Sequence, residues 1–231
     1  MLSTHNTVKI SDNKPITLKN PAMLISDSHK FIYLRMRKVA SQSMRDILMP
    51  LCIPVPGGEI AHLKSRLRLE WNYHRYVFRA HDDILAAQRR MPRRTFEEYF
   101  KFAFVRNPWE RLVSEYEFIL RRPGHGRHRR VRKLQSFSEF INMQIPRRDA
   151  YQLNMLQDRN GRLLMDFVGK LENLEQDWQQ VCQQIGIAHQ ALPRTNVTQR
   201  KDYRDYYDEN TRQRVAKHWA REIERFEYSY D

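Results

Sequence analysis

Glycine, cysteine and acidic residues are all scarce in this chain. It has 7 glycines and 2 cysteines in 231 residues, and 27 acidic residues against 41 basic ones. The glycines do not form the Walker pattern G-x-x-x-x-G-K-[ST], which counts against an ordinary loop for nucleoside triphosphates. Cys52 and Cys182 lie in apolar helical patterns, so we predict two buried thiols. The histidines are scattered and no Cys-x-x-Cys occurs, so no metal site is expected.

Long hydrophobic runs are missing as well. The first twenty residues are polar and contain neither the apolar core of a signal peptide nor a membrane span. The sequence therefore predicts a cytoplasmic protein with reduced thiols and no membrane span. It gives no indication of the oligomeric state.

Positive charge is what the chain has in excess. The net charge of +14 favours an anionic partner, whether a nucleotide, a nucleic acid, an acidic glycan or a membrane surface. Hydrophobic residues make up 41% and aromatic residues 11%, which argues against disorder. We expect one globular domain at residues 30–231, preceded by an N-terminal arm at residues 1–29.

Strand-like and helix-like patterns alternate along the domain. The apolar segments predicted as strands are residues 30–36, 75–80, 101–106 and 162–168. Each is followed by a helical pattern, and the last helix is expected over about residues 209–226. This alternation predicts an α/β fold with a P-loop-like, mostly parallel central sheet flanked by helices in a single domain.

The first candidate site is the polar loop in "RKVASQSMRDIL", between a predicted strand and a predicted helix. A helix N-terminus has unpaired N–H groups and a partial positive charge, so it suits an anion. Lys38 adds a full charge, and Ser41 and Ser43 add hydroxyl groups. Taken alone, the loop fits equally well a helix that is merely capped by Ser41.

The second candidate site is at the start of "RNPWERLVSEY". Asn107 suits a helix cap, Pro108 the first helical position, and Glu110 a capping box. Arg106 is placed at a strand end and suits bidentate phosphate binding, with Ser114 about two turns along the helix. Two anion sites on neighbouring strand ends favour a ligand with phosphates at two positions.

Both loops carry a resemblance to a known family. "KVASQSM" and "FKFAFVRNPWERLVSEY" resemble the two nucleotide-binding motifs of sulfotransferases, in particular the Golgi carbohydrate sulfotransferases and their small bacterial relatives. "AHDDILAAQ", "DFVGKLENLEQDW" and "YRDYYDENTRQRVAKHWAREIERFEYSY" extend the resemblance over roughly residues 30–230. It implies transfer of a sulfuryl group from 3′-phosphoadenosine 5′-phosphosulfate (PAPS) to an acceptor hydroxyl, on a carbohydrate, without a metal.

The resemblance also implies roles for individual residues. By motif, the residues that hold the 5′-phosphosulfate are Lys38, Val39, Ala40, Ser41, Gln42, Ser43 and Met44. The 3′-phosphate is held by Arg106 and Ser114. The loop that closes the nucleotide site supplies Asn196, Thr198 and Arg200. Three positions depart from the family pattern. Gln42 stands where a small hydroxyl residue is common, Arg37 where proline is frequent, and Arg194 where histidine is frequent.

The implied catalytic residues are Lys38 and His81. Lys38 is placed to stabilise charge on the leaving 5′-phosphate. His81 matches the family's histidine and has a suitable intrinsic pKa for a general base, although a polar residue beside a helix cap is the structural alternative. The other candidate bases are Glu70, Asp82 and Asp83.

Two other classes of function are open at the level of the sequence. One is a nucleotide-dependent kinase with an atypical phosphate loop, and the other is a basic protein that binds nucleic acid or another polyanion. No zinc-finger spacing or RNP-like aromatic motif supports a nucleic-acid partner. The basic segment at residues 121–133 is either a solvated loop or a surface that recognises an acidic acceptor, such as an anionic glycan.

Overall fold

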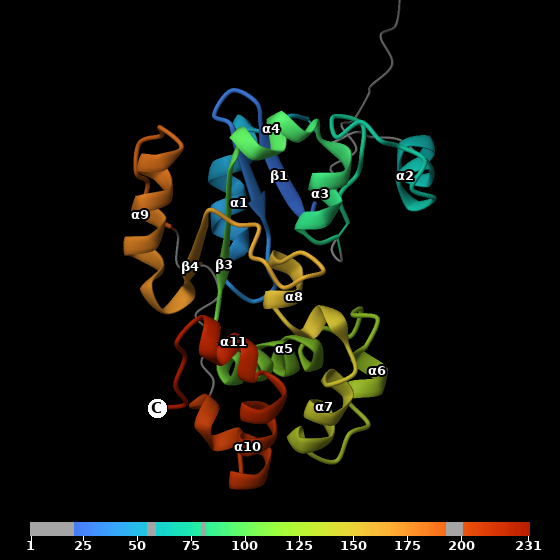
Figure 1. Cartoon of the computed structure of the whole chain (residues 1–231). Coiled ribbons are helices and arrows are strands. Elements are labelled where there is room, and N and C mark those ends of the chain that lie inside the picture. Colours follow the sequence, from blue (N-terminus) through green and yellow to red (C-terminus); the bar gives the residue numbers. More distant parts are fainter. Residues whose placement is uncertain (1–20, 55–58, 80–81, 193–200) are drawn as a thin grey trace, which may run out of the picture.

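The computed structural model describes residues 21–54, 59–79, 82–192 and 201–231. Within these ranges, four strands form one sheet in the order β1 (Met23–Ser26), β2 (Phe31–Leu34), β3 (Phe100–Val105) and β4 (Phe167–Lys170). β2, β3 and β4 run parallel, whereas β1 pairs antiparallel with β2. The prediction of a mostly parallel sheet flanked by helices in one α/β domain is therefore confirmed (Figure 1).

Helices cover the sheet and extend beyond it. Their bounds are α1 (Ser41–Leu48), α2 (Glu59–Arg66), α3 (Ile84–Arg90), α4 (Arg93–Glu98), α5 (Pro108–Leu120), α6 (His128–Val131), α7 (Phe137–Gln144), α8 (Leu153–Leu156), α9 (Leu174–Gln184), α10 (Glu209–His218) and α11 (Ala220–Arg225), with 3₁₀ turns at η1 (Met49–Leu51), η2 (Arg148–Ala150), η3 (Leu171–Asn173) and η4 (Tyr203–Tyr206). Across the described ranges, no helix has both the length and the apolar character that a membrane crossing needs.

Two apolar clusters divide the interior. One surrounds the sheet, and the other is built around the buried side chains of Trp109, Phe140 and Trp219. Figure 1 shows α5, α6, α7, α10 and α11 grouped past the carboxyl end of β3. The carboxyl ends of the parallel strands therefore point toward a second body of helices, and this edge of an α/β sheet is where ligands bind.

Aromatic side chains make the centre of the sheet rigid. The register places Tyr33 of β2 opposite Phe102 of β3, and their buried rings stack with centroids 4.8 Å apart. β4 has Gly169 beside Phe104, since a Cβ at residue 169 would come within 2.5 Å of the Phe104 ring. The strand ends that precede the two candidate loops are thus held by close packing.

Strand β1 lies inside residues 1–29, which the sequence assigns to an N-terminal arm. Its residues Leu24 and Ile25 are buried and form a ladder with Tyr33 and Ile32 of β2. A strand of four residues is too short to show a clear period in the sequence. The sheet therefore begins before residue 30.

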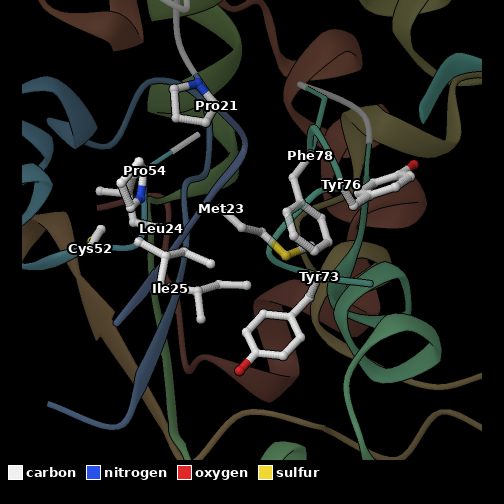
Figure 2. Close-up of a pocket in the computed structure, with 10 residues that line it drawn as sticks. Pro21, Met23, Leu24, Ile25, Cys52, Pro54, Tyr73, Tyr76 and Phe78 are labelled. Carbon is white, nitrogen blue, oxygen red and sulfur yellow. The ribbon is translucent and has the colours of Figure 1, made fainter. Parts of the chain in front are cut away.

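Residues 75–79 form no strand, so the strand prediction for residues 75–80 is wrong over this described part. Tyr76 and Phe78 are buried against β1, and the N–H of Ala22 donates to the carbonyl of Phe78 at 3.1 Å. Figure 2 shows Met23 extending toward Phe78 in a small pocket of about 20 Å³. The segment does not pair with β1 as a strand but covers it with apolar side chains. Covering an edge strand in this way is another means of protecting it from pairing with other chains.

Two other predicted elements have different bounds. The strand predicted at residues 162–168 begins only at Phe167, because the carboxylate of Asp166 accepts from the backbone N–H of Lys101 at 2.8 Å and pairs with its ammonium at 2.7 Å. The helix predicted at residues 209–226 is interrupted at Trp219, whose backbone leaves the helical conformation between α10 and α11.

Both cysteines are free thiols, and Cys182 is buried as predicted, whereas Cys52 is only half-buried. Burial raises the pKa of Cys52 to about 12 and also raises the pKa of Cys182. Since the thiolate is the reactive form, neither side chain is suited to nucleophilic chemistry near neutral pH.

Candidate functional site at the strand ends

The loop after β2 has an unusual backbone. Lys38 and Ala40 have φ angles of 66° and 54°, in the left-handed region that favours glycine. For residues with a Cβ, this conformation costs roughly 1–2 kcal/mol each. Val39, between them, is fully buried and anchors the loop in the core. Strain of this kind is typically found at functional sites, where the surrounding structure enforces it.

The helix after this loop begins without a side-chain cap. Ala40 is the N-cap residue of α1 and Ser41 is the first helical residue, so the alternative in which Ser41 caps the helix is wrong. Gln42 donates to Asp46 at 2.9 Å and Met44 is buried in the core, so their side chains turn away from the helix start. Ala40 has no polar side chain, so the N-cap residue itself does not cap the first N–H groups of α1, which lie at the loop.

The two predicted loops touch each other. Arg106 follows β3, which is parallel and adjacent to β2, and its Nη1 donates to the carbonyl oxygen of Lys38 at 3.2 Å. Its Nη2 donates to the carboxylate of Glu110, one turn into α5. The Arg106 side chain is mostly buried, and its Nε has no hydrogen-bond partner among the described residues. A buried donor of this kind is suited to an additional acceptor, such as a phosphate oxygen.

Ser114 lies on the face of α5 toward the Lys38 loop. Glu110, Ser114 and Phe118 are spaced four residues apart, so they lie along one helix face. Arg106 binds Glu110 at one end of this row, and the ammonium of Lys38 lies over the Phe118 ring at the other, 4.2 Å from its centroid. Lys38, Arg106 and Ser114, predicted from separate motifs, are therefore brought together.

Phe118 is a residue of this arrangement that the sequence did not single out. The guanidinium of Arg122 lies 4.2 Å from the centroid of the ring that Lys38 also contacts, and His125 meets the ring edge-on at 5.9 Å. Cations are attracted to the negative face of an aromatic ring. Phe118 thus gathers three basic side chains beside the loop after β2. An i+4 spacing from Ser114 was the available signal, but it also fits an ordinary core residue.

Gln152 was missed as well, and it fixes the backbone of Arg106. The N–H of Arg106 donates to Gln152 Oε1 at 2.9 Å, and Gln152 Nε2 donates to the carbonyl of Arg106 at 2.8 Å. Nε2 of Gln152 also lies 3.3 Å from Glu222, a buried carboxylate at the other end of the chain. Burial raises the pKa of Glu222, against the opposing attraction of Arg111. No local pattern marks these contacts, which join residues far apart in sequence.

The start of α5 has the predicted N-cap residue but not the predicted capping box. Asn107 Oδ1 accepts from the N–H of Trp109 at 3.0 Å, as expected of an N-cap residue. The expected capping box is wrong, because Glu110 pairs with Arg106 while the Asn107 N–H donates to Glu172 at 2.7 Å. Glu172 follows β4, so a third strand end is tied to the second loop.

Behind the site, α5 carries a buried carboxylate surrounded by arginines. Glu115 pairs with Arg111 at 3.4 Å, with Arg37 at 3.8 Å and with Arg127. Burial opposes ionisation, yet the attraction of Arg111 and Arg127 outweighs it and holds the pKa of Glu115 below its ordinary value. Arg37 comes from the first loop and Arg127 from the basic segment at residues 121–133. Through these two arginines, Glu115 holds the first loop and the basic segment against α5.

Replacing Glu115 with leucine is expected to destabilise the fold by roughly 3–5 kcal/mol, because the charge of buried Arg111 loses its main counterion. In thermal unfolding this corresponds to a fall of about 6–20 °C in Tm. The pKa of Glu115 is depressed below 4.5, so its ion pairs stabilise the fold above that pH and are lost as the pH falls through the lower, folded-state pKa. The difference in Tm between wild type and variant should therefore shrink in acid.

The matched control is Glu98→Leu. Glu98 also pairs with an arginine, Arg94, at 2.6 Å, but on the exposed surface of α4. Exposed ion pairs contribute little, so this variant should unfold close to wild type. Equal effects of the two substitutions would show that Glu115 is not the counterion of a buried charge cluster.

The basic segment at residues 121–133 is partly anchored and partly exposed. Arg127 pairs with buried Glu115, His125 meets the Phe118 ring, and burial together with the nearby charges of Arg127 and Arg37 lowers the pKa of His125. Arg129 and Arg130 of α6 are exposed. The structure thus places a surface of positive charge directly beside the loop after β2.

Four of the predicted site residues lie outside the described residues: His81, Asn196, Thr198 and Arg200. Their predicted roles stay predictions. The seven residues of the first loop and the pair Arg106 and Ser114 are all described, and they lie at one edge of the sheet.

Comparison with known proteins identifies relatives of the chain. A family model described as the sulfotransferase family matches residues 21–229. An uncharacterized protein of Archaeoglobus fulgidus is 32% identical over 117 residues, which cover 50% of this chain and 91% of that protein. Carbohydrate sulfotransferase 14 of Danio rerio is 25% identical over 188 residues, covering 71% of this chain and 48% of that protein. Carbohydrate sulfotransferase 14 of Mus musculus is 34% identical over 96 residues, covering 41% and 22%.

The two named relatives are longer proteins, and this chain spans about half the length of the first and less of the second. The family match, by contrast, includes all four strands, both loops and the helices beyond them. It also begins at residue 21, just before β1. The chain belongs to the sulfotransferase family.

Proposed function

We propose that this protein transfers a sulfuryl group from PAPS to a hydroxyl group of a carbohydrate. The observation that supports this most directly is the hydrogen bond from Arg106 to the carbonyl of Lys38, since it joins two anion-binding loops side by side. A donor with phosphates at two positions suits such a pair of loops. Family membership and the names of two relatives support the reaction class and the acceptor class.

In this proposal the loop after β2 holds the 5′-phosphosulfate. Lys38 supplies a full charge, and residues 39–44, from Val39 to Met44, supply backbone N–H groups at the uncapped start of α1. Arg106 and Ser114 hold the 3′-phosphate, and the unpaired Nε of Arg106 is a suitable donor for it. Asn196, Thr198 and Arg200 are proposed to close the nucleotide site.

The chain's own groups then position the reactants and stabilise charge. When bound, PAPS supplies the sulfuryl group, whose bond to the 5′-phosphate oxygen breaks, with the electron pair going to that oxygen, as the acceptor oxygen bonds to sulfur. Lys38 stabilises the negative charge that develops on the phosphate. His81 is the proposed base that takes the proton of the acceptor hydroxyl.

The acceptor is proposed to be an acidic glycan. Arg122 lies beside the loop after β2, and exposed Arg129 and Arg130 extend this positive surface away from it. A cleft lined by one sign of charge raises the local concentration of a substrate of the opposite sign. A screen of neutral and anionic polysaccharides with labelled donor should show faster transfer to the anionic ones at low salt, and equal rates would contradict this acceptor class.

Calorimetric titration separates this proposal from its alternatives. The protein is expected to bind adenosine 3′,5′-bisphosphate at least about tenfold more tightly than ATP or a DNA duplex, because only the bisphosphate satisfies both loops. Arg106→Ala should weaken bisphosphate binding roughly 10- to 150-fold, the value of a charged hydrogen bond. Arg129→Ala, an exposed arginine of α6, is the matched control and should bind normally.

Two outcomes of this titration would contradict the proposal. A preference for ATP would indicate the kinase alternative. Tightest binding to DNA, with an affinity that falls steeply with salt, would indicate a polyanion-binding protein. Thermal unfolding of Arg106→Ala, compared with wild type, shows whether its loss of affinity is local.

A further inference from the structure

Exposed apolar side chains are concentrated in one place. Among the described residues, the large hydrophobic side chains that are exposed are Ile60, Leu63, Leu67, Leu69 and Trp71, with exposed fractions between 54% and 73%. All five belong to α2 and the five residues after it. Scattered exposed leucines are ordinary, but a contiguous group of this kind usually marks a binding surface. We call these five residues the α2 apolar surface.

The orientation of α2 directs this surface away from the protein. Ser65 is the fully buried residue of the helix, and its hydroxyl accepts the N–H of Val77 at 2.9 Å. Leu63 and Leu67 are each two residues from Ser65, or about 200° around the helix, so they point to the opposite side. The N–H of Leu67 donates to the carbonyl of Leu63 at 2.9 Å, which continues the helical turn past Arg66. The apolar face of α2 is therefore its outer face.

Charged side chains border this apolar face, and the basic ones are in excess. Lys64 and Arg66 are exposed and lie on either side of the line through Leu63 and Leu67, while exposed Glu59 lies one turn before Leu63. An apolar stripe with cations at its edges and a tryptophan nearby is the pattern of helices that lie in the surface of an anionic membrane. Long basic side chains there reach the lipid phosphates while the apolar side chains enter the acyl boundary.

A second copy of the chain is a poorer partner for the same surface. Pairing two such helices would bring Lys64 and Arg66 of each copy toward those of the other, in a protein whose net charge is already +14. An anionic lipid surface instead neutralises these charges. We propose that the α2 apolar surface docks the protein on anionic phospholipid membranes, with Ile60, Leu63, Leu67, Leu69 and Trp71 inserted at the interface.

The position of α2 leaves the candidate site free when it is docked. Figure 1 shows α2 at the upper edge of the molecule beyond α3, whereas α5, which carries Ser114, lies below the sheet. Docking is therefore independent of the loops after β2 and β3. The proposed function and the proposed docking can fail separately.

Tryptophan fluorescence offers a direct measurement. Of the four tryptophans, Trp109, Trp178 and Trp219 are buried and Trp71 is exposed. Adding vesicles of phosphatidylglycerol and phosphatidylcholine should shift the emission to shorter wavelength and protect it from acrylamide quenching. Vesicles of phosphatidylcholine alone should produce little change, because they lack the anionic charge. Trp71→Phe should still sediment with the anionic vesicles but lose the spectral shift.

Two pairs of variants decide whether α2 is responsible. Leu63→Ser/Leu67→Ser should weaken vesicle binding at least about tenfold. Because both positions are exposed, the folding of this variant and its bisphosphate affinity should be unchanged. Lys64→Glu/Arg66→Glu should also weaken it at least about tenfold, whereas Arg129→Glu/Arg130→Glu, with the same change of charge on α6, should have a much smaller effect.

Several results would overturn the proposal. Equal losses from the α2 and α6 charge variants would show that the net charge alone binds the vesicles. Unchanged binding in Leu63→Ser/Leu67→Ser would show that the apolar face does not insert. A dimer in analytical ultracentrifugation that this variant dissociates would assign the surface to a second copy of the chain.

Discussion

Replacement of Lys38 with methionine is expected to lower sulfuryl-transfer turnover roughly 10²- to 10³-fold, the effect of removing one main group that stabilises developing charge. Lys38 precedes the uncapped start of α1, and its carbonyl is bonded to Arg106. Methionine is a long, unbranched side chain that can keep contact with the Phe118 ring, where the ammonium lies now. The substitution therefore removes the charge and keeps most of the packing. Turnover is measured with labelled PAPS at saturating donor.

The expected pattern separates a catalytic role from a structural one. Affinity for the donor PAPS should fall much less than turnover, since the charge on the 5′-phosphate grows only as the sulfate leaves. Lys38→Arg should recover part of the activity. Lys217→Met, which removes an exposed lysine of α10, is the matched control. Near-normal turnover in Lys38→Met would mean that this loop does not hold the transferring group.

Replacement of His81 with alanine is expected to lower turnover about 10²- to 10⁴-fold, the range for loss of a general base. The described neighbours of His81 support the proposal. Asp83 pairs with Arg148 at 3.4 Å, and the next residue, Asp149, pairs with Arg37 of the first loop at 3.8 Å. The chain just after residue 81 is thus tied to the edge of the sheet that holds the candidate site. Bisphosphate affinity should stay within about twofold of wild type.

The alternative bases give the controls for this experiment. Asp83 is engaged by Arg89 at 4.0 Å as well as by Arg148 at 3.4 Å, so both oxygens of its carboxylate already have cationic partners. Glu70 accepts the N–H of Asn72 at 3.0 Å and lies in the chain between Leu69 and Trp71 of the α2 apolar surface. Asp83→Asn and Glu70→Gln should therefore keep most of the activity. Full turnover in His81→Ala, or a large loss in Asp83→Asn, would overturn the assignment of the base.

The parts of the site that could be predicted from sequence are those with local causes. Asn107 followed by Pro108 specifies a helix start, and the structure begins α5 there. The apolar segments of β2 and β3 predict buried strands because each is rich in strand-forming residues and too short for a helix. Parallel pairing of these strands then brings the loops after them together, as expected from the alternation of strands and helices.

The rest depends on contacts that no local pattern contains. Gln152 binds the backbone of Arg106 from 46 residues away, and Glu222 in turn accepts from Gln152 across 70 residues. Glu110 has the right spacing for a capping box, but its carboxylate pairs with Arg106. The Asn107 N–H donates to Glu172 instead. β1 is recognisable only by its pairing with β2. The left-handed backbone at Lys38 and Ala40 was hidden because neither residue is glycine.

The hydrogen bond from Arg106 to the Lys38 carbonyl has a thermodynamic consequence for the proposed site. A phosphate that orders one loop also orders its neighbour, so the entropic cost of fixing the second loop is already met when the second phosphate arrives. The two phosphate positions should then bind with positive cooperativity. By linkage, each would increase the affinity for the other by the same factor. A nucleotide with both phosphates would thus be distinguished from either monophosphate by more than the sum of the separate contacts.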